Sequence, residues 1–251
     1  MPEELSKFER DGLGLAGKGI VKILVIDIGG SHVKWKIWGN SSKKKIRSGR
    51  KLTPQAMVDR IGKATPHWPY DAVSIGFPGP IIHGRPAGDP PNLGPGWIHF
   101  DYEKAFGKKV RMINDAAMQA LGSYHGGRML FIGLGTGVGS ALILDDVIVP
   151  LELGELKFSK QSTVAEALGK ARLKEVGIKR WAKTVHGVVP RLVAAFRTDY
   201  VVIGGGNAKH LQRLPTGARR GSNDRAFIGG ARLWGVGDLH ARPRKHTWTI
   251  T

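Results

Sequence analysis

Short apolar runs separated by glycine-rich turns dominate the chain and predict β-strands. Residues 22–28 form one such run, and after a glycine pair the residues 32–38 alternate between apolar and polar side chains. This pattern predicts a β-hairpin. Apolar segments at 128–133 and 140–144, joined by the sequence LGTGVG, predict a second hairpin.

Further strands and helices are predicted from the same kind of periodicity. Strands are expected at residues 72–76, 110–113 and 200–203. Helices are expected from Thr53-Pro54, from Asn114-Asp115 through Leu121, behind the capping-box pattern Ser162-Thr163 with Glu166, over 175–196 and over 227–234. Pro190 is expected to kink the helix over 175–196. Residues 84–97, rich in Gly and Pro, are expected to form a loop, and the basic tail from His240 is expected to be loose.

Each half of the chain begins with a hairpin and continues with helix-then-strand units. This repetition predicts an α/β protein of two related lobes with a ligand between them. We expect a small lobe over residues 1–113 and a large lobe over 114–251. The last helix, near 226–235, is expected to pack back on the small lobe.

Composition narrows the class of protein. The chain has 251 residues, 41% of them hydrophobic, and no cysteine. Disulfides, thiolate nucleophiles and Cys-ligated zinc or iron–sulfur sites are therefore excluded. No apolar run approaches the roughly 20 residues of a membrane helix, and the first residues lack a secretory apolar region. We expect a cytoplasmic protein with no membrane partner.

Positive charge is concentrated in two segments. The net charge is +19, and residues 32–63 and 180–251 supply all of it, with 10 basic against 1 acidic and 13 basic against 3 acidic residues. The clusters at 43–51 and 240–246 are the densest. Such a field attracts polyanions such as nucleotides, polyphosphate or nucleic acid. The alternative is a solubility device without a specific ligand.

Three glycine-rich loops have the composition of phosphate-binding sites. Asp27, Gly29, Gly30 and Ser31, with Lys34, offer backbone donors, a hydroxyl, a cation and a carboxylate for Mg²⁺. The segment Gly133–Ser140 has Gly at every second position around Thr136, and Gly204-Gly205-Gly206-Asn207 follows a strand. Taken alone, the first loop is better explained as an ordinary hairpin turn, the second only suggests a phosphate site, and the third could equally be a plain glycine-rich connection.

Acidic residues at two places suit work on sugar hydroxyls. Asp115 follows a strand and opens a helix, where it could be a general base or, with Asn114, a helix cap. Glu152 and Glu155 flank a glycine and could bind a pair of hydroxyls or form a solvated turn. The nine histidines show no metal-like spacing on a helix, and none is assigned to a metal.

The order of these motifs resembles the ROK family of sugar kinases, from about Ile23 to Trp234. The motifs are DIGGSHVK, GFPGP, PPNLGPGW, INDAAMQALG, LGTGVGSALI, ELGEL and VVIGGGN. The resemblance implies the actin-like, Hsp70/hexokinase-type ATPase fold with a central cleft. Within the family the chain is most similar to bacterial polyphosphate glucokinases, because of the Lys in DIGGSHVK, the RWAK segment at 180–183, and the short length without a zinc motif.

The resemblance also implies a role for each matching residue. Asp115 is implied as the catalytic base. The implied sugar-binding residues are Gly79, Asn92, Asn114, Asp115, Glu152, Glu155 and Glu166. The implied phosphate-binding residues are Asp27, Gly29, Gly30, Ser31, Lys34, Gly135, Thr136 and Gly137, with Asp27 near Mg²⁺. The implied nucleotide or polyphosphate site comprises Gly204, Gly205, Gly206 and Asn207.

The expected activity is transfer of a phosphoryl group from polyphosphate or ATP to the 6-hydroxyl of glucose or a similar hexose. No zinc is expected, because the family's Cys-rich loop is absent, and a homodimer is expected by resemblance. Glu155 replaces the family's usual His, which leaves the sugar open. The alternatives are an ATP-only kinase for mannose or fructose, or a non-catalytic sugar sensor that binds nucleic acid. A nucleic-acid partner is disfavoured because the N-terminal helix-turn-helix of ROK repressors is missing.

Overall fold

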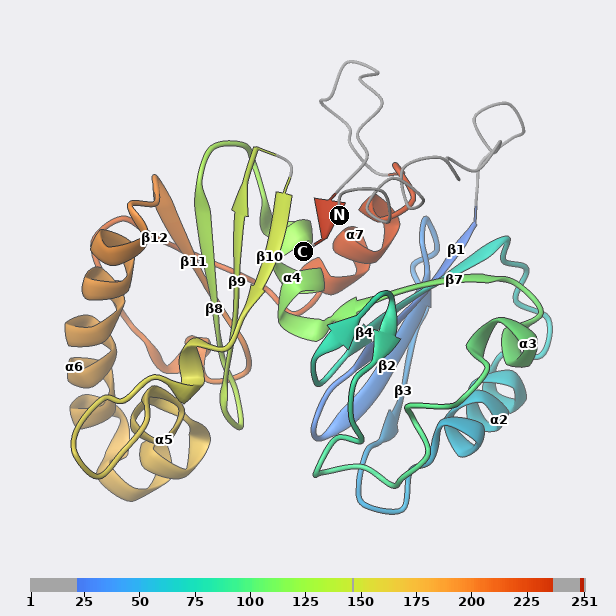
Figure 1. The fold of residues 1–251 in the computed structure, drawn as a ribbon, viewed down its shortest axis with the longest axis horizontal. Helices are drawn as coiled ribbons and strands as arrows, with labels where there is room; N and C mark the ends of the chain where they lie inside the picture. The colour runs from blue at the N-terminus through green and yellow to red at the C-terminus, as the bar shows by residue number, and fades with distance from the viewer. Residues whose placement is uncertain (1–21, 146, 237–248, 251) are drawn as a thin grey trace, which may run out of the picture.

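Two β-sheets form the framework, with helices between them and on both outer faces (Figure 1). The computed structural model describes residues 22–145, 147–236 and 249–250. From one side of the molecule to the other, the layers follow the order helix, sheet, helix, sheet, helix. The basic tail from His240 lies outside the described residues except for its last strand, and no described helix is long and apolar enough to cross a bilayer.

The first sheet has the strand order β3-β2-β1-β4-β7. Its strands are β1 (Ile23–Ile28), β2 (His32–Ile37), β3 (Lys43–Arg47), β4 (Ala72–Phe77) and β7 (Lys109–Asn114). β1, β2 and β3 pair antiparallel, whereas β4 and β7 continue the sheet in parallel. The outer face packs on α2 (Pro54–Ala64) and α3 (Tyr102–Phe106), and a small hairpin of β5 (Ile81–Ile82) and β6 (Arg85–Pro86) follows β4.

The second sheet has the strand order β12-β11-β8-β9-β10-β13. Its strands are β8 (Met129–Leu134), β9 (Val138–Leu144), β10 (Val147–Leu151), β11 (Tyr200–Gly204), β12 (Ala218–Arg220) and β13 (Thr249–Ile250). Its outer face packs on α5 (Val164–Leu168) and α6 (Lys170–Phe196). Two 3₁₀ turns, η1 (Leu153–Glu155) and η2 (Ala208–His210), follow β10 and β11.

Two helices fill the space between the sheets: α4 (Asp115–Ser123) and α7 (Arg225–Arg232). They cross in close contact, because a Cβ on Gly122 or Gly229 would collide with the backbone of the other helix. α7 also packs on β1 and β4, where the Ser74 hydroxyl donates to the Gly230 carbonyl at 2.6 Å. α7, which follows β12 of the second sheet in sequence, therefore contacts the first sheet.

Most of the elements expected from periodicity are present. The two hairpins, the strands at 72–77, 109–114 and 200–204, and the helices beginning at Pro54 and Asp115 all form. The capping box is confirmed, since the Glu166 amide donates to Thr163 Oγ1 at 3.2 Å and the Thr163 amide donates to Glu166 Oε2 at 2.7 Å.

Some expectations were wrong or incomplete. The backbone of α6 leaves the helical conformation at Gly177 (φ 76°, ψ 165°) and not at Pro190. Glycine adopts positive φ readily, whereas the φ that proline imposes is compatible with a helix. The strands β3, β10 and β12 and the helix α3 were not predicted, and the expected loop 84–97 contains the two-residue strand β6.

Candidate active site

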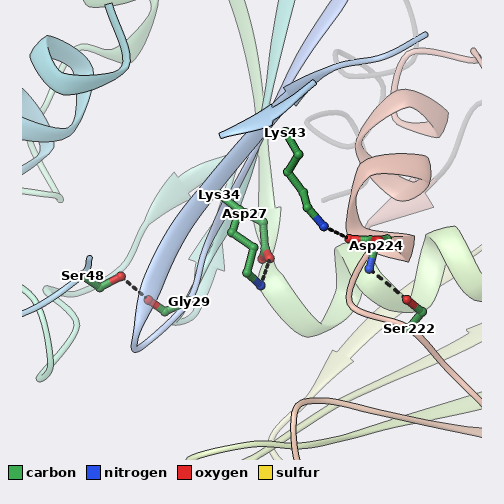
Figure 2. A network of polar contacts seen from close by, with 7 residues as sticks. All are labelled: Asp27, Gly29, Lys34, Lys43, Ser48, Ser222 and Asp224. Carbon is green, nitrogen blue, oxygen red and sulfur yellow. Dashed lines mark hydrogen bonds and ion pairs between the residues drawn. The ribbon is translucent and has the colours of Figure 1, made fainter. Parts of the chain in front are cut away.

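Asp27 lies near the C-terminal end of β1, and the glycines follow it in the turn to β2. The turn is closed by the Gly29 amide, which donates to the His32 carbonyl at 3.0 Å, and the Ser48 hydroxyl donates to the Gly29 carbonyl at 2.6 Å (Figure 2). A Cβ on Gly30 would lie 3.9 Å from Thr136 Oγ1. The first two predicted phosphate loops, which come from different sheets, therefore face each other.

The second and third glycine loops are fastened together. The Asn207 side-chain amide donates to the Gly135 carbonyl at 2.8 Å, and the Lys170 amide donates to the same carbonyl at 3.0 Å. Gly205 has a φ of 81°, and a side chain there would collide with the backbone of Leu134. Asn207 was predicted as a ligand-binding residue, and in the structure its amide holds the two loops in place.

A pocket of about 290 Å³ opens beside the third loop. Gly205, Gly206 and Lys209 line one part of it, and Ser222 and Asn223 line another. The Arg220 guanidinium in its wall donates to the carbonyls of η2 and the residue that follows it, at 2.6 and 2.5 Å. The pocket is thus a preformed space next to the glycine loops.

The structure shows which of Asn114 and Asp115 caps the helix that follows β7. Asn114 is the N-cap of α4, because its side-chain oxygen accepts from the amides of Ala116 (2.9 Å) and Ala117 (3.2 Å). Asp115 is the first helical residue, and its Oδ1 accepts from the Ala116 amide at 2.7 Å. Because Asn114 supplies the cap, the second carboxylate oxygen of Asp115 is not needed for capping.

Three carboxylates come within electrostatic range of one another. Burial, which is the largest cause, and the charges of Asp27 and Glu152 together raise the pKa of Asp115 to about 7, although the hydrogen bond from the Ala116 amide acts in the opposite direction. Burial also raises the pKa of Asp27, while Lys34, whose Nζ lies 3.4 Å from its carboxylate, opposes that shift. An aspartate with a pKa near 7 can accept a proton at neutral pH.

The structure brings several of the predicted sugar-binding residues together. The Asn114 amide donates to the Gly79 carbonyl at 3.2 Å. Trp97, in the loop that contains Asn92, packs on Phe77 below the Gly79 turn, with ring centroids 5.7 Å apart. That loop is held by the Asp89 carboxylate, which accepts from the Trp97 amide at 2.8 Å. The Asn92 side chain is exposed at the surface of this loop.

Glu152 is the N-cap of the η1 turn and Glu155 is its last residue. Partial burial and the neighbouring Glu155 raise the pKa of Glu152. The Gly154 between them packs against the Val138 carbonyl. The turn is fixed by the buried Ser140 hydroxyl, which donates to the Leu151 carbonyl (2.7 Å) and accepts from the Leu153 amide (3.1 Å).

Glu166 stands apart from this group. Its carboxylate is used in the capping box of α5, which packs on η1. Among the contacts of the described residues, none joins the Glu166 side chain to Asp115 or to the glycine loops. Its assignment to the sugar stays a prediction.

Two features of the site were not identified from the sequence. One is the anchoring role of Ser140, whose only sequence signal is a hydroxyl at an inward-facing position of an apolar strand. The other is an ion pair of Lys43 in β3 with Asp224 at the N-terminus of α7, with Nζ 2.6 Å from Oδ1 (Figure 2). Lys43 could not be placed because β3 itself was not predicted.

Comparison with known proteins agrees with this architecture. The ROK family profile matches residues 23–150. The polyphosphate glucokinase of Mycobacterium tuberculosis (strain ATCC 25618 / H37Rv) is 26% identical over 211 residues, which cover 75% of this chain and 78% of the relative. The chain therefore belongs to the ROK family.

Solved structures show the same fold. The inorganic polyphosphate/ATP-glucomannokinase of Arthrobacter sp. strain KM has a TM-score of 0.73 and 24% identity, over 86% of this chain and 99% of that chain. The ROK family glucokinase of Streptomyces griseus, solved with glucose and AMPPNP, has a TM-score of 0.69 and 16% identity, over 84% and 98%. The fold is thus the actin-like fold of ROK sugar kinases.

Proposed function

We propose that this protein is a sugar kinase that transfers a phosphoryl group from polyphosphate or ATP to the 6-hydroxyl of glucose or a similar hexose. The observation that carries the proposal is Asp115, whose pKa is raised to about 7 by burial and by the charges of Asp27, beside the first glycine loop, and of Glu152. The names of the similar proteins, polyphosphate glucokinase and polyphosphate/ATP-glucomannokinase, support the same class of reaction.

Asp115 is the proposed general base. As the sugar oxygen forms its bond to the terminal phosphorus, the hydroxyl proton passes to the Asp115 carboxylate. The bond from that phosphorus to the bridging oxygen of the donor breaks, and the shortened donor leaves with the bonding electrons. Positioned proton acceptors of this kind typically contribute about 10²- to 10⁴-fold to the rate.

The sugar is proposed to bind between Asn114, Glu152 and Glu155, with the Gly79 and Asn92 loops closing over it. Carboxylates and amides that pair with several hydroxyls reject analogues that lack one of them, because a buried polar group would be left unpaired. Glu155 stands where the family usually has His; when ionised it can accept hydrogen bonds but cannot donate them, whereas a histidine ring can donate. We therefore propose that this residue sets the preference among hexoses.

The donor phosphates are proposed to lie along the facing glycine loops. The backbone amides near Gly30 and Gly135 and the cation of Lys34 stabilise the charge on the transferred group. Asp27 fits a Mg²⁺ ion, because this cation is usually held by one or two carboxylates together with phosphates and waters. When bound, Mg²⁺ would neutralise charge on the donor phosphates. Among the described residues, no group of three His, Asp or Glu side chains is arranged to hold a metal.

The test is a matrix of hexoses against donors. Glucose, mannose and fructose are each incubated with ATP or long-chain polyphosphate in the presence of Mg²⁺, and the sugar 6-phosphate is quantified. Turnover with at least one pair supports the kinase. Absence of product with every pair, from a protein that is folded by circular dichroism, contradicts it and favours a sugar sensor. The predicted homodimer and cytoplasmic location are independent of this outcome.

A further inference from the structure

One face of the β2–β3 hairpin is formed only by basic residues. The register pairs His32 with Arg47, Lys34 with Lys45 and Lys36 with Lys43. Because side chains alternate along a strand, these directly opposed pairs share one face of the hairpin. We call this set the cationic ladder; its members are His32, Lys34, Lys36, Lys43, Lys45 and Arg47.

The cationic ladder lies on the side of the sheet that faces the catalytic residues. On β1, Asp27 pairs with Lys34, and Val25, which contacts Gly230 of α7, pairs with Lys36. The intervening residues of β2, among them Trp35, are buried on the opposite face against α2 and α3. The ladder therefore continues directly from Asp27 to the edge strand β3.

Most of this charge is not neutralised by acidic residues. Lys34 pairs with Asp27 and Lys43 with Asp224. For the other ladder members, the described part of the chain offers no carboxylate within ion-pair distance. Like charges directly opposite on neighbouring strands destabilise a sheet, so the arrangement costs stability in the absence of an anion.

Protection of a sheet edge does not explain the ladder. Lysines on an edge strand prevent pairing with other chains, which would account for Lys43, Lys44 and Lys45 in β3. β2, however, is an internal strand between β1 and β3. Lys34 pairs with Asp27, but edge protection does not account for Lys36, which has no ion-pair partner among the described residues.

Lys43, at the end of the ladder away from Asp27, lies close to the wall of the pocket beside the third glycine loop. The Lys43 ammonium is 2.6 Å from Asp224, whose amide donates to the Ser222 hydroxyl at 3.2 Å (Figure 2). Ser222 lines the 290 Å³ pocket. The ladder thus borders both the reaction centre at Asp27 and the pocket beside the third glycine loop.

We propose that the cationic ladder binds an inorganic polyphosphate chain whose terminal phosphoryl group lies at Asp27 and Lys34. This inference rests on the proposed function and assigns the donor to a particular surface. A nucleic acid would satisfy the same charges, but its internal phosphodiesters offer no terminal phosphoryl group to the Asp115 side of the ladder. Polyphosphate offers both a repeating anion and a transferable end.

The matched pair Lys45→Ala and Lys44→Ala tests the proposal. Both variants remove one positive charge from the same exposed strand, but Lys45 opposes Lys34 on the ladder, whereas Lys44 opposes Trp35 on the other face. We expect Lys45→Ala to raise the KM for polyphosphate about fivefold and Lys44→Ala to change it less than about twofold. The KM for ATP should change less than about twofold in both variants.

Salt dependence gives a second readout, which needs no turnover. Binding of labelled polyphosphate to the sugar-free protein is measured from 50 to 300 mM NaCl. The slope of log affinity against log salt reflects the number of phosphates contacted, and Lys45→Ala should reduce it by up to about one unit, unlike Lys44→Ala.

Each outcome separates the possibilities. Equal effects of the two variants on polyphosphate, or no effect of either, would overturn the ladder. Loss of affinity for a labelled single-stranded oligonucleotide in Lys45→Ala, with polyphosphate binding unchanged, would overturn it in favour of a nucleic-acid surface. Failure of the wild type to phosphorylate any hexose would refute the proposed function, while the binding measurement would still decide on the ladder.

Discussion

Asp115→Asn is expected to abolish catalysis and at the same time to stabilise the fold. The substitution removes the proton acceptor but retains an oxygen for the Ala116 amide, which donates to Asp115 Oδ1 at 2.7 Å. The turnover number should fall about 10²- to 10⁴-fold. The stability gain follows from the pKa of Asp115, which burial raises from 3.8 to about 7.

The direction in which the Asp115 carboxyl changes folding stability with pH follows from the protons bound by the folded and unfolded chains. Below pH 3.8 the carboxyl is protonated in both folded and unfolded chains, so it contributes nothing. As the pH rises to about 7, the unfolded chain loses its proton before the folded one, and stability falls; above pH 7 the loss is complete. Asparagine does not titrate and avoids this loss.

Solvent screening limits the stability gain expected for Asp115→Asn. At about 1.36 kcal/mol per pKa unit, the shift from 3.8 to about 7 sets a ceiling of about 4 kcal/mol. The Asp115 side chain is partly exposed, so screening reduces the expected gain to about 1 to 2 kcal/mol. For a chain of this size, each kcal/mol shifts the melting temperature by roughly 2 to 4 °C.

The assay is unfolding of both proteins in urea between pH 5 and pH 8.5. The advantage of Asp115→Asn should grow up to about pH 7 and then level off. Asp199→Asn is the control of opposite sign, because a hydrogen bond from Arg128 lowers the pKa of Asp199. An Asp115→Asn protein that is no more stable than wild type at pH 8.5, or equally stabilised at every pH, would refute the reasoning.

Three further predictions follow from the same geometry. For the wild type, kcat/KM for the sugar should rise with pH through about 7, because Asp115 must be ionised to accept a proton; a profile that is flat between pH 6 and 8 would contradict this. Ser140→Ala leaves the Leu153 amide without its acceptor, so it should lower the unfolding free energy by about 1 to 3 kcal/mol and raise the KM for the sugar more than that for the donor. An unchanged KM for the sugar would mean that the Ser140 hydroxyl does not position the Glu152 turn. Gly205→Ala should destabilise the fold by about 1 to 3 kcal/mol, because φ is positive and a Cβ would meet Leu134, whereas Gly206→Ala, where nothing lies within 4 Å, should be nearly neutral in the same unfolding experiment.

Periodicity was sufficient for the elements that build the framework. β1, β4, β8 and β11 are short, mainly apolar runs, and such runs are typical of strands buried on both faces. A turn containing glycine follows each of these strands and marks in the sequence where the strand ends. The order of the motifs along the chain indicated the ROK family, although each loop taken alone was ambiguous.

Elements that are stabilised mainly by their neighbours could not be predicted. β3 reads KKKIR and has one partly buried apolar residue, so its strand conformation depends on pairing with β2. β12 is a three-residue strand at the other edge of the fold, and β10 contains Pro150, which argues against a strand in isolation. The charge of residues 32–63 was evident, but its sorting onto one face was not, because that requires the β2–β3 register.

The close crossing of α4 and α7 also could not be predicted from the sequence. Gly122 and Gly229 look like weak points within helices, since glycine lowers helix stability by about 1 kcal/mol. In the structure each glycine removes a side chain where the other helix passes. Only the packing of residues more than 100 positions apart gives them a role.

The most direct test of the central claim is the fate of the phosphoryl group in the wild type and in Asp115→Asn. Glucose is incubated with polyphosphate or ATP and Mg²⁺, and the products are followed by phosphorus NMR. We predict a new phosphate monoester on the 6-hydroxyl with the wild type and at least a hundredfold slower formation with the folded variant. Equal rates for the two proteins, or release of inorganic phosphate without a sugar ester, would contradict the assignment of Asp115 and of the kinase.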